Sequence, residues 1–127
     1  MPRGRGRGQR CHHPCDCGWR VRWTARFRLG AQSMGIWDSV RAELKDIEKR
    51  LRDEKRRDEV LRRLLSEPVV ADVYVKRLGK TFPARRYYFG RATARGFYVV
   101  RSEICRVWFV ALLPRTDSTY KSKKVRA

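Results

Sequence analysis

The sequence has no asparagine, only two glutamines and only two histidines, His12 and His13, which are neighbours. Thermolabile amides are depleted in proteins from hot habitats, so this composition favours a thermophilic source. No apolar run reaches the ~18 residues of a membrane span, and residues 1–33 lack the uninterrupted apolar stretch of a secretory signal. We therefore expect a cytoplasmic protein, or one held within a nucleoprotein particle.

Catalytic combinations of residues are also missing. Both histidines lie near the N-terminus, and Asp72 and Glu103 are the only acidic residues between positions 68 and 114. A paired-carboxylate site has little to draw on, and no glycine-rich phosphate-binding motif occurs. The sequence therefore predicts that this protein is not an enzyme.

Positive charge, in contrast, is abundant and unevenly distributed. The net charge is +19, yet residues 34–67 contain 10 basic and 9 acidic side chains, a net of +1. The remainder divides into +7 for residues 1–33, +7 for 68–114 and +4 for 115–127. Such self-repulsion is relieved by a polyanion, and the excess of Arg (24) over Lys (8) suits phosphate groups. A GC-rich genome would explain the Arg bias equally well, but the charge remains.

Residues 38–66 are predicted to form one long helix. Apolar residues from Trp37 to Leu65 follow a 3-4-3-4 spacing that Glu54 and Asp58 interrupt. Asp38 or Ser39 can cap its start, and Pro68 ends it. The interruption suggests a solvated middle between two apolar ends.

Residues 69–113 read as four strands, at 69–76, 85–92, 97–102 and 106–113, joined by short turns. We therefore expect an α+β fold: one long N-terminal helix, then a small four-stranded antiparallel meander forming a sheet or an SH3-like half-barrel. Basic extensions would flank it, giving an arm (1–33), a helix (34–67), a β domain (68–114) and a tail (115–127).

Residues 19–29 alternate aromatic or apolar side chains with arginines. This period of two predicts a strand with one apolar face and one phosphate-binding face, formed by Arg20, Arg22, Arg26 and Arg28. A second interpretation stays open. Composition changes abruptly at Met34, so residues 1–33 could be an upstream extension from a misplaced start codon, without a fold of its own.

A cysteine and histidine cluster is the one candidate metal site. Cys11, Cys15, Cys17 and His13 offer enough soft ligands for one structural zinc ion. The spacing lacks the two-residue gap that lets two thiolates grip one ion, and no second pair follows. Free thiols in a basic arm therefore stay the favoured interpretation.

Basic and aromatic residues alternate throughout the predicted sheet, an arrangement typical of surfaces that bind phosphates and stack bases. With the arginines of residues 20–28, the candidate binding residues here are Tyr74, Lys76, Arg86, Tyr88, Arg106 and Trp108. The favoured hypothesis is an RNA-binding structural component of a ribosome or other ribonucleoprotein. One alternative is a DNA-binding chromatin or viral nucleoprotein that dimerises through its helix. Another is a protein-interaction adaptor.

Overall fold

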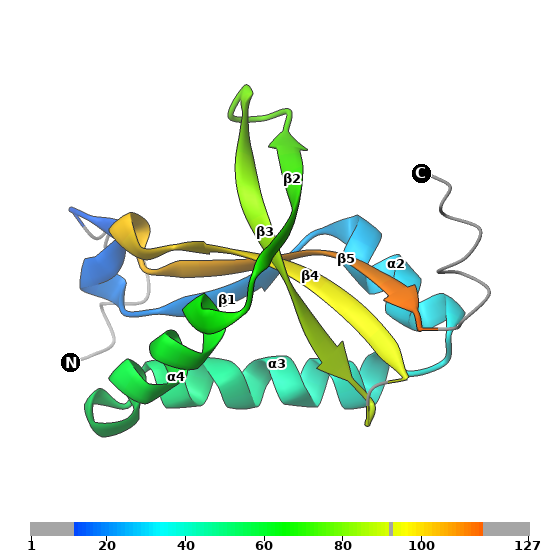
Figure 1. The fold of residues 1–127 in the computed structure, drawn as a ribbon. Coiled ribbons are helices and arrows are strands. Elements are labelled where there is room, and N and C mark those ends of the chain that lie inside the picture. Colours follow the sequence, from blue (N-terminus) through cyan, green and yellow to red (C-terminus); the bar gives the residue numbers. More distant parts are fainter. Residues whose placement is uncertain (1–11, 92, 116–127) are drawn as a thin grey trace.

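A computed structural model describes residues 12–91 and 93–115. Its centre is a five-stranded mixed sheet in the order β1-β5-β4-β3-β2 (Figure 1). The strands are β1 (Arg20–Trp23), β2 (Val69–Val75), β3 (Lys80–Phe89), β4 (Ala94–Arg101) and β5 (Arg106–Pro114). Strand β1 pairs with β5 in parallel, and the other neighbours are antiparallel.

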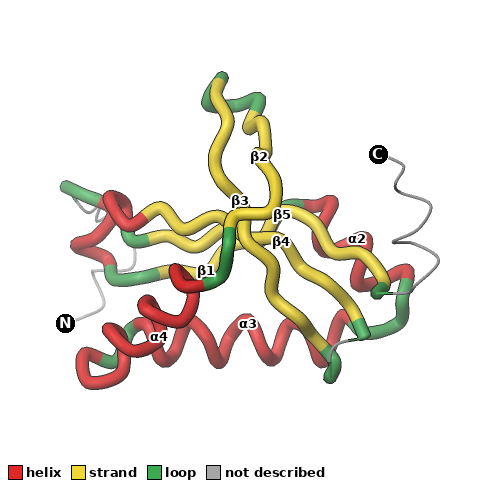
Figure 2. The backbone as a smooth tube through the Cα atoms, viewed as in Figure 1, coloured by secondary structure: helices red, strands yellow, loops and turns green. Residues whose placement is uncertain are grey.

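Three short helices accompany the sheet: α2 (Ala25–Ser33), α3 (Trp37–Leu51) and α4 (Glu54–Ser66). Two 3-10 turns, η1 (Pro14–Cys17) and η2 (Ser102–Ile104), lie at one end of the sheet. Figure 2 shows α3 running beneath the strands, while the β2–β3 hairpin rises away from the helices. No helix in the part of the chain described here is long and apolar enough to cross a membrane.

The predicted fold class, one long helix and a four-stranded antiparallel meander, is wrong. The first reason is the segment before Met34, which supplies a fifth strand and an extra helix. Only Arg20–Trp23 of the expected strand is extended, because the Thr24 hydroxyl accepts a hydrogen bond from Phe27 N (3.1 Å) and caps α2. Phe27 and Ala31, four residues apart, then face the core.

The second reason is a break in the predicted long helix. The Asp53 carboxylate accepts from Lys55 N (3.0 Å) and starts α4, and the Arg57 guanidinium donates to the Leu51 carbonyl (2.7 Å) at the end of α3. Helix α4 then turns back over the end of α3 (Figure 1). The acidic gap in the apolar spacing therefore marks a turn, and Leu64 rather than Leu65 is buried on α4.

The core lies between the sheet and helices α3 and α4. Helix α3 contributes Val40, Leu44, Ile47 and Leu51, all buried against the rings of the sheet. Four rings of the sheet, Tyr87, Phe89, Tyr98 and Phe109, form a cluster with Phe27 of α2, in which contacting rings have centroids 4.7–6.4 Å apart. Aromatic pairs at these separations stabilise a core beyond their buried area.

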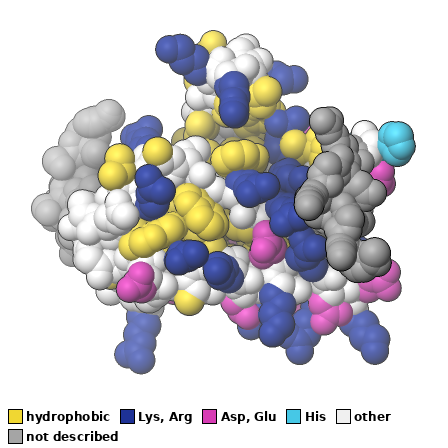
Figure 3. Space-filling view, turned by 180° about the vertical axis from the view of Figure 1, so that it is seen from behind, with side chains coloured by type: hydrophobic (Ala, Val, Ile, Leu, Met, Phe, Trp, Pro, Cys, Tyr) yellow, Lys and Arg dark blue, Asp and Glu magenta, His cyan; other side chains and the backbone are white. Residues whose placement is uncertain are grey.

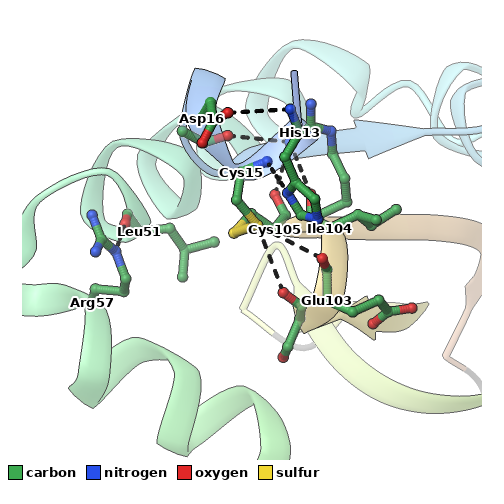
Figure 4. The surroundings of a disulfide bond; sticks show 11 residues. His13, Cys15, Asp16, Leu51, Arg57, Glu103, Ile104 and Cys105 are labelled. Carbon is green, nitrogen blue, oxygen red and sulfur yellow. Dashed lines mark hydrogen bonds between the residues drawn. A yellow bond between two sulfur atoms is a disulfide. The ribbon is translucent and has the colours of Figure 1, made fainter. Parts of the chain in front are cut away.

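Residues 12–33 belong to this core, with Trp19, Val21, Phe27 and Ala31 buried. A disulfide joins Cys15 of η1 to Cys105, the residue between η2 and β5 (Figure 4). The boundary expected at residue 33 therefore does not separate an arm from a domain. The glycine–arginine segment 1–10 and most of the expected tail lie outside the described residues.

Candidate nucleic-acid interface

One face of the sheet looks away from α3 and α4. Strand register assigns it, because side chains alternate along each strand and Val21, Val107, Phe109 and Tyr98 point into the core. Their neighbours in sequence therefore point the other way. We call this surface the open face. It contains Arg20 and Arg22 of β1, Arg106 and Trp108 of β5, Val99 and Arg101 of β4, and Arg86 and Tyr88 of β3.

The register brings six of the predicted binding residues to this face. Arg20 lies beside Arg106, and Arg22 lies beside Trp108, across the parallel pairing of β1 and β5. Arg86 and Tyr88 follow on β3, paired with Phe97 and Arg95 of β4. The open face therefore joins residues more than 80 positions apart in sequence.

The other predicted residues lie elsewhere. Arg26 and Arg28 are exposed on α2 instead of continuing the strand. Tyr74 and Lys76 belong to the β2–β3 hairpin, where Tyr74 pairs with Thr81, on the side of the hairpin opposite Phe82. The first four residues of β2 are all exposed, and the pairing of the strand directs Tyr74 away from Tyr88 and Trp108.

Positive charge on the open face has little acidic compensation. Among the described residues, ion pairs join Arg50 to Asp46, Arg56 to Asp53 and Arg101 to Glu103, and two of these three lie on helices. Arg20, Arg22 and Arg86 have no such carboxylate partner in the same set. A surface of this kind attracts anions, with a strength that depends on salt.

The surroundings of Arg106 show that the cations of the open face lie close to one another. Burial, reinforced by the neighbouring Arg22 and Arg20 guanidinium groups, lowers the pKa of Arg106. One of its nitrogens, Nη1, donates to the carbonyls of Gly18, Ile104 and Cys105 at 3.0–3.2 Å. Arg106 thus holds the end of the sheet together as well as adding charge to the open face.

Among the predicted aromatic residues, Tyr88 lies close to two arginine side chains. Its ring is 40% exposed, and the guanidinium carbons of Arg86 and Arg115 lie 5.6 and 5.1 Å from its centroid. These are cation–π distances. An exposed ring with guanidinium groups nearby is the combination that single-stranded nucleic acid binds, since rings stack on bases and cations contact phosphates.

The sequence pattern missed a groove beside the open face. It has a volume of about 460 Å³ and is lined by Phe82, Leu78, Val99, Arg101, Trp108 and others. Phe82 falls between the predicted strands 69–76 and 85–92, where a turn is expected, whereas β3 begins at Lys80. Alternation from Phe82 through Arg86 to Tyr88 was the available signal, because it places all three on one face.

The space-filling view from behind shows how side chains of each type are distributed on that side of the molecule (Figure 3). Hydrophobic side chains form a patch below the projecting hairpin, and Lys and Arg side chains surround and interrupt it. Most acidic side chains lie toward the lower edge, where α3 runs in Figure 1. Apolar and basic groups are therefore interspersed over the sheet and not segregated.

One of the predicted zinc ligands, Cys15, takes part in a disulfide with a cysteine outside the predicted set. Cys15 is bonded to Cys105, and His13 Nδ1 accepts a hydrogen bond from Cys15 N at 3.1 Å (Figure 4). No group of three metal-ligating side chains occurs within residues 12–91 and 93–115, and Cys11 lies outside them. The favoured interpretation of free thiols is wrong for the described cysteines, because Cys15, Cys17 and Cys105 are all disulfide-bonded. Zinc binding stays a prediction, and for Cys15 and Cys17 it would require the reduced thiolates.

Comparison of this chain with protein-family models, with curated proteins and with solved structures finds no match. The chemistry of the open face therefore has to be inferred from its own residues. These offer cations and aromatic rings.

Proposed function

We propose that this protein is a non-catalytic RNA-binding protein, acting as a structural component of a ribosome or other ribonucleoprotein. One observation supports this most strongly. The open face sets arginines beside aromatic rings on β1, β5 and β3, and Arg101 is its one cation paired to a carboxylate among the described residues. Arginine forks bind phosphates, and exposed rings stack on bases.

RNA is favoured over duplex DNA because the rings lie on a sheet. An open sheet face suits unpaired bases that can leave a helical stack. The proposal keeps the cytoplasm, or a particle assembled there, as the compartment. A disulfide in such a compartment fits a thermophilic source, since intracellular disulfides are common in hyperthermophiles.

The DNA-binding alternative loses its main motivation. It rested on a helix free to form a coiled-coil dimer. Val40, Leu44, Ile47 and Leu51, the apolar residues of that helix, are instead buried in the chain's own core. The adaptor alternative predicts binding that does not depend on salt, whereas phosphate binding weakens steeply as salt rises.

A competition experiment tests the proposal. The tagged full-length chain is incubated with a mixture of total RNA and sheared duplex DNA, and the retained nucleic acid is identified by nuclease sensitivity. We expect RNase-sensitive material to dominate, with release on raising the salt concentration. Equal retention of DNA would favour the chromatin alternative, and retention of neither at low salt would overturn nucleic-acid binding.

A further inference from the structure

The groove beside the open face is lined mainly by apolar and aromatic side chains. Val99 and Trp108 come from β4 and β5, and Phe82 and Leu78 come from the β2–β3 hairpin. Its volume of about 460 Å³ is within the range of small-ligand sites, roughly 300–1,000 Å³. The hairpin rises away from the helices (Figure 2), and its Leu78 and Phe82 side chains line one side of the groove.

Two aromatic rings in this groove stand apart from the core. Among the described residues, contacts between aromatic rings occur within the core and between Trp23 and Trp37. Neither Phe82 nor Trp108 takes part in these contacts. Both rings are half-buried and line the groove. Both rings are therefore separate from the ring contacts of the core, and both contribute to the lining of the groove.

Cations border the same groove. The Arg101 guanidinium lies 4.6 Å from the Phe82 centroid, and the Lys80 ammonium lies 5.9 Å from it. The exposed Arg77 adds a third cation at the hairpin. Glu103 offsets one of them, because it accepts a hydrogen bond from Arg101 Nε at 2.6 Å and points into solvent. An apolar, aromatic floor with a cationic rim fits a flat group attached to phosphates.

We infer that this groove binds an unpaired nucleobase of single-stranded RNA, stacked on Trp108 and Phe82. The flanking phosphates would contact Arg77, Lys80 and the arginines of the open face. This inference rests on the proposed function and adds that the bound RNA is single-stranded at the groove. A paired base cannot enter, because it is already stacked and hydrogen-bonded inside a duplex. A purely electrostatic surface would bind single strands and duplexes through phosphates alone.

The test compares three RNA probes by fluorescence anisotropy with the full-length protein at one salt concentration. They are a short single strand, its fully paired duplex, and a strand of equal length whose central nucleotides are abasic. The abasic strand keeps every phosphate but has no central base to stack. We expect the single strand to bind about 5- to 150-fold more tightly than the abasic strand, the range for one stacked base.

Variants then locate the contact. Phe82→Leu and Trp108→Leu should each lose most of the preference for the intact strand, while their affinity for the abasic strand stays within about twofold, since phosphate contacts are untouched. Tyr74→Leu is the matched control, because this ring is exposed on the other side of the hairpin. It should keep the wild-type preference. Circular dichroism checks folding, and if Trp108→Leu does not fold, Phe82→Leu and the wild-type probe comparison still decide.

The outcomes separate this inference from the proposed function. Equal affinity of the wild type for intact and abasic strands, or preference for the duplex, would overturn base binding in the groove and leave RNA binding intact. Equal loss of preference in Tyr74→Leu and the groove variants would also overturn it. Absence of binding to all three probes would overturn both proposals.

Discussion

The hydroxyl of Tyr98 is a polar group placed deep in the core, where it links the sheet to the end of a helix. It donates to the Leu64 carbonyl of α4 at 2.6 Å, and Tyr98 has no exposed surface. Tyr98→Phe removes the donor and leaves that carbonyl without its partner. We expect the free energy of unfolding to fall by about 1–2 kcal/mol, measured by denaturant titration.

Tyr74→Phe is the control for this substitution. The ring of Tyr74 is 61% exposed, so water replaces any partner of its hydroxyl. Its stability should stay within about 0.5 kcal/mol of the wild type. Equal effects of the two substitutions would mean that the Tyr98 hydrogen bond does not stabilise the fold.

Individual residues of the open face could be predicted only in part from the sequence. Alternation along β1 and β5 correctly grouped Arg20 with Arg22 and Arg106 with Trp108 on their strands. Alternation alone could not relate β2 to β3. That relation depends on a register with a bulge between Val69 and Ala71, which sends Tyr74 to the other side from Tyr88.

Gly30 sets how closely α2 approaches the sheet. A Cβ atom at this position would lie 2.5 Å from the Leu112 carbonyl oxygen, which is backbone and cannot rotate away. Alanine gains about 1 kcal/mol over glycine in a helix. The clash should outweigh that gain, because overpacking costs about 1–3 kcal/mol and α2 must move as a unit.

We therefore expect Gly30→Ala to lower the melting temperature. Gln32→Ala, at an exposed position of the same helix, should leave it nearly unchanged. A Gly30→Ala variant as stable as the wild type would show that α2 does not pack on β5 at this distance.

The Cys15–Cys105 disulfide connects elements at opposite ends of the chain, with a sequence separation of 90. In the chain-entropy model, closing a loop of this length lowers the entropy of the unfolded chain and so stabilises the fold by about 4–5 kcal/mol. Cys105→Ser should lower the free energy of unfolding by about 2–5 kcal/mol. Thermal unfolding of the wild type and of this variant measures the difference, and an unchanged transition would argue against the bond.

At the scale of elements, the apolar spacing predicted the buried face of the first part of the long helix but not the turn that follows it. Val40, Leu44, Ile47 and Leu51 are buried at the expected 3-4 spacing. Glu54 and Asp58 were correctly seen as an interruption, but the turn itself was missed. It depends on the Asp53 cap and on Arg57 reaching back to Leu51, and these contacts exist only in the folded chain.

At the scale of the whole molecule, residues 12–33 are structural. They place four buried side chains in the core and add β1 to the sheet. Burial of a large apolar side chain contributes roughly 1.5–3 kcal/mol, against a typical total stability of 5–15 kcal/mol. A chain of residues 34–127 should therefore show no cooperative thermal transition. A transition at the full-length temperature would instead support the interpretation of residues 1–33 as an extension without a fold.

Parallel pairing of β1 with β5 was not predictable from local pattern. It joins Val21 to Val107 across 86 positions, and no short motif marks such a contact. The net charge of +19, in contrast, follows directly from the sequence, because it depends only on composition. What composition could not give was the face on which the cations meet aromatic rings.

The central claim, that RNA binds the open face of the sheet, is tested most directly by the salt dependence of two double variants. Arg20→Gln with Arg22→Gln removes two cations of that face. Arg41→Gln with Arg62→Gln removes two exposed cations from α3 and α4, with the same change in net charge. The measurement is the slope of log affinity for single-stranded RNA against log salt concentration.

Each phosphate contact contributes about 0.7 to this slope for a single strand. The account predicts a slope shallower by up to about 1.4 for the open-face variant, and a wild-type slope for the helix variant. Equal slopes for the two variants, or a larger change in the helix variant, would contradict it.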